Sequence, residues 1–157
     1  MELVRDKGYN LRDIKEENRS FNLCLAAVMS RGWALKYVPD YNKSYQLCLC
    51  AVKQDGTALE FVPSQWHTPR MKNTALKHYG RALQYLSLRN RILYCEEALE
   101  MHGRALEFVP EERRTYLMCL KAVKKTGSAL EFVPKIHRTS ELICAALKSD
   151  SQSRIFV

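Results

Sequence analysis

The chain has 157 residues, of which 46% are hydrophobic and 27% charged, a balance that is typical of a folded domain or short repeat array and argues against disorder. Its longest apolar run, Leu23 to Met29, is far shorter than the roughly 20 residues that cross a bilayer, and its charged N-terminus lacks the apolar stretch of a secretory signal. The formal net charge of +8 favours acidic partners, such as nucleic acid, an anionic membrane surface or an acidic protein, without choosing among them.

The six glycines of the chain are spaced 24, 24, 24, 23 and 24 residues apart, a regularity that chance does not produce. Each glycine opens a copy of the segment Gly-x-Ala-Leu-x-aromatic-Val-Pro, beginning with a weak copy at Gly8 to Lys15 and a full copy at Gly32 to Pro39. Later copies lie at 56–63, 80–87, 103–110 and 127–134. The chain is therefore expected to be a tandem repeat.

An amphipathic helix of about 11 residues is predicted before each of the later glycines. Apolar residues recur at i, i+3, i+4 and i+7 from Phe21, from Tyr45 and again from Tyr116. A hydroxyl residue precedes each helix at the position where an N-cap side chain accepts from free backbone N–H groups. These predicted caps are Ser20, Ser44, Thr68, Thr115 and Thr139.

A second, shorter helix is predicted after each glycine. The glycine is expected to end the first helix as a left-handed residue, and the Ala-Leu-x-aromatic-Val segment then forms a helix of about six residues that the proline stops. The aromatic residue of this segment is expected in the core. Because neither helix can bury its apolar face alone, neighbouring repeats must stack.

The repeat is irregular between Gly80 and Gly103, where one residue is missing. The same stretch has Ser87 in place of the proline and Arg91 in place of the N-cap. We expect a kink or a looser joint there. The chain closes on residues 151–157, a decayed copy of the Gly-x-Ala-Leu-x-Phe-Val segment.

Together these elements predict an all-α fold, an α-solenoid of about six tandem helix-turn-helix repeats. We expect a single helical-repeat domain over residues 1–157. Its repeats are predicted near 1–15, 16–39, 40–63, 64–87, 88–110 and 111–134, with a partial repeat at 135–157.

The motif Leu-Cys-Leu-x-Ala-Val-Lys-x-x-Gly-x-Ala-Leu-Glu-Phe-Val-Pro, present at Leu47–Pro63 and closely at Met118–Pro134, resembles the helical-repeat family catalogued as domain of unknown function 4116. The resemblance covers nearly the whole chain. It implies helical repeats of the kind found in bacteria, some viruses and protists, including secreted effector-like proteins, and it implies no catalytic residues. We therefore expect a cytoplasmic location, or delivery into a host cytosol if the protein is a secreted effector.

The cysteines favour a structural role. Cys24, Cys48, Cys95 and Cys119 recur at one helix position, and Cys144 lies one residue out of register. Stacked helices lie roughly 9–10 Å apart, whereas zinc needs sulfurs about 2.3 Å from one shared ion. The column therefore predicts free, buried thiols in a reducing compartment, with a reactive thiol as the alternative.

Sequence motifs for catalysis are missing from the chain. There is no nucleophile elbow, phosphate-binding glycine loop or zinc-protease motif, and the glycines are all explained by the repeat. We expect no enzymatic activity and no cofactor or metal.

Two columns of basic residues are candidates for binding. Three residues before the glycines stand Lys53, Lys77 and Lys124, which either complement the helix C-terminus or form a binding ladder. The residues that precede the caps are Arg19, Lys43, His67, Arg114 and Arg138. Cations just before a helix N-terminus are disfavoured by the helix dipole, so the second column is the better binding candidate, with a solvated edge as the alternative.

Large aromatic residues outside the repeat pattern are further candidates. Trp33, Tyr41 and Trp66 are predicted interface anchors, although some of them could instead cover the core.

Three functions compete. The first is a non-enzymatic protein-interaction module, such as a bacterial or phage effector or inhibitor that binds an acidic protein partner, because a strict framework with variable surface positions suits a scaffold. The second is binding of RNA or DNA backbones through the basic ladders. The third is an accessory domain of an enzyme. No membrane insertion is expected.

Overall fold

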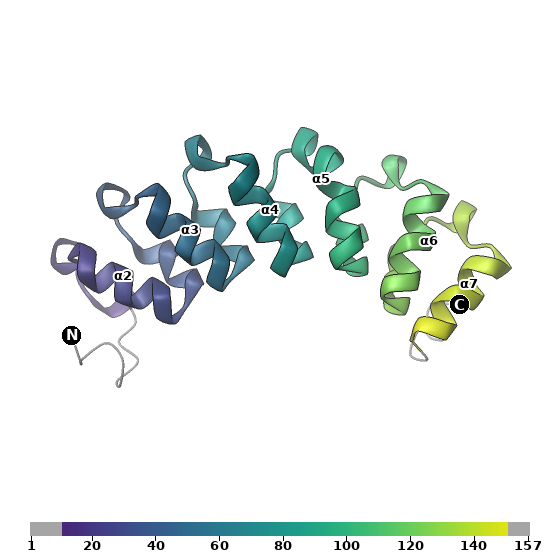
Figure 1. Cartoon of the computed structure of the whole chain (residues 1–157), viewed down its shortest axis with the longest axis horizontal. Helices are drawn as coiled ribbons and strands as arrows, with labels where there is room; N and C mark the ends of the chain where they lie inside the picture. The colour runs from purple at the N-terminus through teal and green to yellow at the C-terminus, as the bar shows by residue number, and fades with distance from the viewer. Residues whose placement is uncertain (1–10, 151–157) are drawn as a thin grey trace. The chain divides into compact units, whose positions relative to one another are not determined.

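The computed structural model describes residues 11–150, and every regular element in that range is a helix (Figure 1). The predicted all-α helical-repeat fold is thereby confirmed. The α-helices are Phe21–Ser30 (α2), Tyr45–Gln54 (α3), Pro69–His78 (α4), Leu88–Met101 (α5), Tyr116–Lys125 (α6) and Ser140–Ser149 (α7). Within the same range, no helix combines the length and the hydropathy that spanning a bilayer requires.

The second helix of each repeat is present as a six-residue 3-10 helix, a form common in short helical pieces. These helices are Gly32–Tyr37 (η3), Gly56–Phe61 (η5), Gly80–Tyr85 (η7), Gly103–Phe108 (η8) and Gly127–Phe132 (η10). Shorter 3-10 helices lie in the connectors and before α2: Leu11–Asp13 (η1), Glu16–Asn18 (η2), Asp40–Asn42 (η4), Ser64–Trp66 (η6), Glu111–Arg113 (η9) and Lys135–His137 (η11).

The chain divides by its internal contacts into two compact units, Met1–His78 and Tyr79–Val157. In the N-terminal unit, α2, α3 and α4 pack in succession, and η3 packs on η5. In the C-terminal unit, α5, α6 and α7 pack in succession, as do η7, η8 and η10. Each six-residue 3-10 helix contacts the α-helix that follows it, and η3, η5, η8 and η10 also contact the α-helix before them.

The core of each unit is built from the framework residues of the repeat. The alanine and leucine of every Gly-x-Ala-Leu segment are buried, and so is the residue that follows the aromatic position. The aromatic residues themselves are half-buried, so the expectation that they lie in the core is wrong. They instead flank the core at the surface, where Lys36 lies 5.9 Å from the centroid of the Phe61 ring and Arg104 lies 4.9 Å from that of Phe132.

The predicted N-caps are confirmed. Each hydroxyl oxygen accepts a hydrogen bond from the backbone N–H three residues later. The five pairs are Ser20 with Leu23 at 3.4 Å, Ser44 with Leu47 at 3.2 Å, Thr68 with Met71 at 3.3 Å, Thr115 with Met118 at 3.3 Å and Thr139 with Leu142 at 3.3 Å.

The glycines are explained by close packing between neighbouring repeats. The φ angles of Gly32, Gly80 and Gly103 lie outside the left-handed region, so the expected left-handed helix end is wrong for these three. A Cβ atom added at Gly32 would lie 2.4 Å from the carbonyl oxygen of Ala51 in α3, and one added at Gly103 would lie 2.3 Å from that of Ala122 in α6. Glycine thus lets the α-helix of the next repeat approach the backbone.

The predicted irregularity after Gly80 takes the form of a longer helix. Helix α5 has 14 residues where the other α-helices have 10, and it begins directly after Ser87. In a regular repeat, a three-residue 3-10 helix and a capping segment precede the α-helix. In this repeat one extra α-helical turn takes their place, and the turn is one residue shorter than the segment it replaces. Arg91, at the predicted cap position, lies inside this helix.

Candidate functional site

Four of the five basic residues that precede the helix caps contact backbone carbonyl groups of their own connector. In three of the arginines, Nε donates to the carbonyl oxygen five residues earlier, just beyond the 3-10 helix. The pairs are Arg19 with Ile14 at 2.8 Å, Arg114 with Val109 at 2.8 Å and Arg138 with Val133 at 3.0 Å. His67 makes the equivalent contact, with Nε2 3.0 Å from the oxygen of Val62.

Two of these arginines also join consecutive repeats. A terminal nitrogen of Arg19 donates to the oxygen of Tyr37 at 2.8 Å, and one of Arg114 donates to that of Phe132 at 2.6 Å. Lys43 is only 12% exposed at its side chain, and its Nζ lies 2.9 Å from a carboxylate oxygen of Asp40. We call the residues eleven positions after each glycine the connector column.

The connector column has a structural role at the ends of the 3-10 helices. The α-helix that follows disfavours a cation at its start, but Arg19, Arg114 and Arg138 bind the carbonyl groups at the end of the preceding 3-10 helix, which attract cations. The dipole therefore gives no reason to assign the column to binding, and its role toward a partner stays a prediction.

The irregular repeat keeps this contact. Arg91 also lies eleven residues after a glycine, and its Nε donates to the oxygen of Leu86 at 3.0 Å while Nη2 donates to that of Gln84 at 2.7 Å. Arg91 therefore does more than stand in place of a missing cap. Arg91 is a member of the connector column, and in this repeat it lies inside the extra turn of α5.

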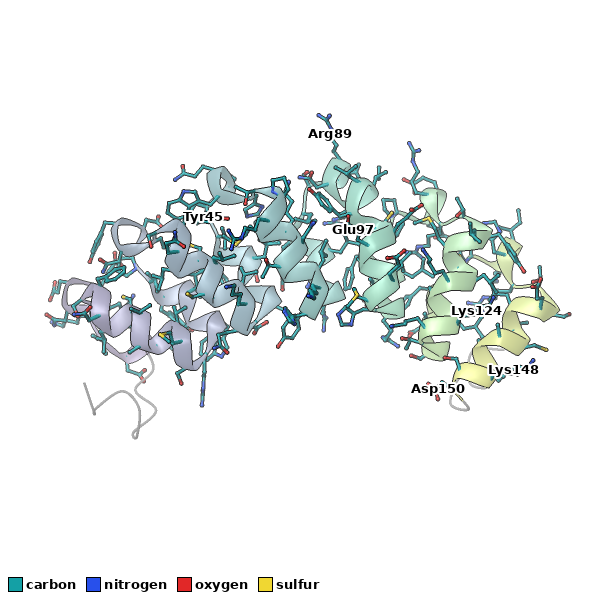
Figure 2. All side chains as sticks on the ribbon, in the orientation of Figure 1. Tyr45, Arg89, Glu97, Lys124, Lys148 and Asp150 are labelled. Atoms are coloured by element: carbon teal, nitrogen blue, oxygen red, sulfur yellow. The ribbon has the colours of Figure 1, made fainter. Side chains whose placement is uncertain are left out.

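The lysines that precede the glycines lie in the last turns of the α-helices with exposed side chains. Lys53 on α3 and Lys77 on α4 belong to the N-terminal unit. In the C-terminal unit, Lys124 on α6 and Lys148 on α7 occupy neighbouring places (Figure 2). Glu100 takes the equivalent place on α5, and its carboxylate accepts a hydrogen bond from Lys121 at 2.8 Å.

The predicted aromatic anchors do not come together in one site. Trp33 is half-buried and lies edge-on to Tyr37, with ring centroids 5.8 Å apart. Trp66 is half-buried beside a cavity of about 490 Å³ that Lys43 also lines. Tyr41 is 71% exposed, and its hydroxyl donates to the oxygen of Glu16 at 3.2 Å.

An exposed apolar surface that the sequence reasoning missed lies on the α-helices of the C-terminal unit. Leu93 on α5 is 68% exposed and Leu117 on α6 is 73% exposed. Both stand ten residues before a glycine. The equivalent positions in the other described repeats hold polar residues: Asn22, Gln46, Arg70 and Glu141. Two leucines at an otherwise polar position were the signal that could have found this surface.

Two grooves meet along α6. The α5–α6 groove has a volume of about 290 Å³ and is lined by Glu96, Leu99, Leu117, Leu120, Lys121 and Lys124, among others. The α6–α7 groove, of about 480 Å³, is lined by Leu120, Lys124, Glu141, Cys144, Ala145 and Lys148, with Ser149 at its edge. Both grooves have mostly apolar walls with lysine side chains along them.

The cysteines behave as core residues. All six are free, and the four of the repeated column are buried. Burial raises the pKa of Cys48 and of Cys119 to about 11 and raises the pKa of Cys24 and Cys95 as well. Cys144 is exposed in the α6–α7 groove. Among the described residues, no three His, Cys, Asp or Glu side chains form a group that could hold a metal ion.

Comparison with known proteins gives one match. Residues 20–66 match the model of the family described as a domain of unknown function (DUF4116), and this segment includes the first of the two motif copies, Leu47–Pro63. Searches of curated proteins and of solved structures found no match. The segment that is similar to the DUF4116 family runs from residue 20 to residue 66 and spans the elements from α2 to η6.

Proposed function

We propose that this protein is a non-enzymatic helical-repeat module that binds an acidic protein partner through the exposed face of α5, α6 and α7. The observation that carries the proposal is Leu117, a leucine that is 73% exposed on α6 and lines the α5–α6 groove. Exposed apolar groups that border a groove and alternate with charged groups are typical of protein-binding surfaces.

The charges of this face support an acidic partner. Helix α6 carries Lys121, Lys124 and Lys125 and no acidic residue. Of these, Lys121 is paired with Glu100, while Lys124 has no hydrogen bond or ion pair with another described residue. A partner with carboxylates near Lys124 would gain attraction without having to break a bond inside the protein.

Nucleic-acid binding has less support. The arginines of the connector column donate to backbone carbonyl groups, and Glu100 interrupts the other column between Lys77 and Lys124. A phosphate backbone needs a continuous run of free cations, so neither column offers a ladder along the repeats.

The proposal is tested by affinity capture with the whole chain, comparing wild type with Leu117→Asp. The matched control is Ile136→Asp, which also replaces an exposed apolar residue of the C-terminal unit, in η11 and outside both grooves. We expect Leu117→Asp to weaken binding of the captured protein by about tenfold or more, since a buried leucine contributes about 1.5–3 kcal/mol. Ile136→Asp is expected to bind like wild type.

Circular dichroism of both variants shows whether the fold is retained, and a nuclease-treated sample identifies nucleic acid as a bridge. Equal capture by wild type and Leu117→Asp would rule out this face as the binding surface. Capture that disappears with nuclease, and that falls steeply with salt, would favour nucleic acid instead.

A further inference from the structure

We infer that the α6–α7 groove takes an acidic amphipathic α-helix of the partner, with apolar side chains on Leu120 and Ala145 and carboxylates beside Lys124 and Lys148. This inference rests on the proposed function and specifies the kind of partner segment. The two lysines lie at neighbouring places on parallel repeats (Figure 2).

The groove separates apolar from charged contacts along its length. Leu120 and Ala145 stand about one helical turn before Lys124 and Lys148, respectively. At the other end, the Glu141 carboxylate already accepts a hydrogen bond from the Tyr116 hydroxyl at 2.9 Å. The cations that line the groove are therefore concentrated at the C-terminal end of α6 and α7, away from Glu141.

The charges around the groove are unbalanced. Helices α6 and α7 together carry Lys121, Lys124, Lys125 and Lys148 against the single acidic residue Glu141. Neither Lys124 nor Lys148 has a hydrogen bond or ion pair with another residue of the described range. An acidic segment is thus the complementary occupant.

A helical partner fits this surface better than an extended one. Residues 11–150 contain no strand, so the surface offers no sheet edge for an extended segment to pair with. An extended partner would bury peptide groups without partners, at about 1–3 kcal/mol for each group. A helix brings its backbone already paired, and its side-chain ridges fit the groove between two helices.

The required partner pattern follows from the spacing of the groove residues. Apolar residues three or four apart would contact Leu120, Cys144 and Ala145, and acidic residues one turn further along would reach Lys124 and Lys148. The helix therefore needs its acidic residues next to one end of its apolar stripe.

The test measures fluorescence anisotropy of labelled peptides with the whole chain. The first peptide is a helix with this pattern, the second has lysine in place of each acidic residue, and the third keeps the composition but carries a central proline. A single-stranded oligonucleotide of equal charge is the fourth probe. We expect the first peptide to bind at least about tenfold more tightly than the others.

Protein variants locate the site. Lys124→Glu with Lys148→Glu should weaken the first peptide by about tenfold or more, because two attractive contacts become repulsive. Ala145→Met, which fills the groove without changing its charge, should weaken it as well. Arg113→Glu with Lys135→Glu changes the charge equally on the exposed connectors of the same unit and should alter affinity by less than about twofold.

Several results would overturn the inference. One is equal binding of the helical and proline-containing peptides, a second is equal binding of the oligonucleotide, and a third is an equal loss in the connector variant. Self-association that Lys124→Glu with Lys148→Glu abolishes would assign the groove to a second copy of the chain. If no peptide binds but Leu117→Asp still prevents capture of a partner, the inference fails and the proposed function stands.

Discussion

The residues that recur in the repeat contribute to the fold in different ways, which can be seen from the atoms that surround each of them. The glycines leave room for the next repeat, since a Cβ atom at Gly103 would lie within 2.3 Å of a carbonyl oxygen. The connector arginines satisfy carbonyl groups, and the column of cysteines fills the core. Leu93 and Leu117 depart from the pattern, and neither is buried. At this scale, departure from the repeat marks an exposed apolar surface, whereas membership of a column marks a role in the framework.

The cysteines give a prediction about reactivity at single residues. The pKa of Cys48 and Cys119 is raised to about 11, so at pH 8 only about one thiol in a thousand is ionised at these positions. The exposed Cys144 should be alkylated by iodoacetamide first, and the four buried thiols should react only after unfolding. Peptide mass spectrometry over a time course measures the order. Modification of Cys119 as fast as Cys144 in the native protein would contradict burial as the controlling factor.

At the scale of the element, each repeat ends its 3-10 helix with carbonyl groups that need donors. The connector column supplies them, and it does so even where α5 has gained a turn and lost the separate connector helix. The i to i−5 spacing of the contact survives, because Arg91 keeps its distance from Gly80 while the cap is lost. In this repeat, the contact to the carbonyl groups is kept although the N-cap is lost.

Replacing Arg114 by methionine should destabilise the protein. The side chain donates to three carbonyl oxygens, those of Glu107, Val109 and Phe132, and the last joins η10 to the preceding connector. Hydrogen bonds from a charged group contribute about 1.5–3 kcal/mol, so we expect a loss of about that size in the free energy of unfolding. Arg113→Met, at the exposed neighbouring position, is the control.

Urea denaturation of the two variants and wild type gives the comparison. Equal stability of Arg114→Met and Arg113→Met would mean that the contacts of Arg114 add nothing beyond what water supplies. A weakened partner interaction in Arg114→Met with unchanged stability would return the connector column to the binding surface.

The helical elements could be predicted from the sequence because each leaves a local signal. Caps such as Ser44 and Thr115 and the glycine period define where the α-helices begin and end. The type of the second helix and the reason for the glycines were not accessible, since both depend on how closely the next repeat approaches. Gly32 faces the carbonyl oxygen of Ala51, nineteen residues away, and no local pattern reveals that contact.

The candidate site could be predicted only in part. Lys124 was a sequence candidate and lines both grooves. Leu117 was overlooked although its position is polar in most repeats, and Leu120 was overlooked because the grooves form only where neighbouring helices are stacked. Arg114 was predicted to bind a partner, but its side chain is used inside the protein. Its charge suggested a surface, while its partners are backbone atoms two elements away.

On the scale of the whole molecule, the division into two units predicts that residues 79–157 fold without the N-terminal unit. In this segment α5, α6 and α7 pack in succession over η7, η8 and η10, with an apolar core of their own. Repeat proteins draw their stability from contacts between neighbouring repeats, so three stacked repeats can suffice.

Circular dichroism and urea denaturation of the 79–157 fragment measure this, and we expect helical signal with a cooperative transition. A fragment without helical signal would show that the C-terminal unit depends on residues before Tyr79.

The buried framework of the repeat has a further consequence for how the sequence can evolve. The framework contacts lie away from the outer face of the α-helices; they are made by the glycines, alanines, leucines and connector arginines of the repeat. The exposed positions of Leu93, Leu117 and Lys124 are therefore not needed for folding. Substitutions at these positions can accumulate without producing variants that fail to fold. A library randomised at those three positions should therefore keep a high proportion of soluble members while its binding specificity diverges.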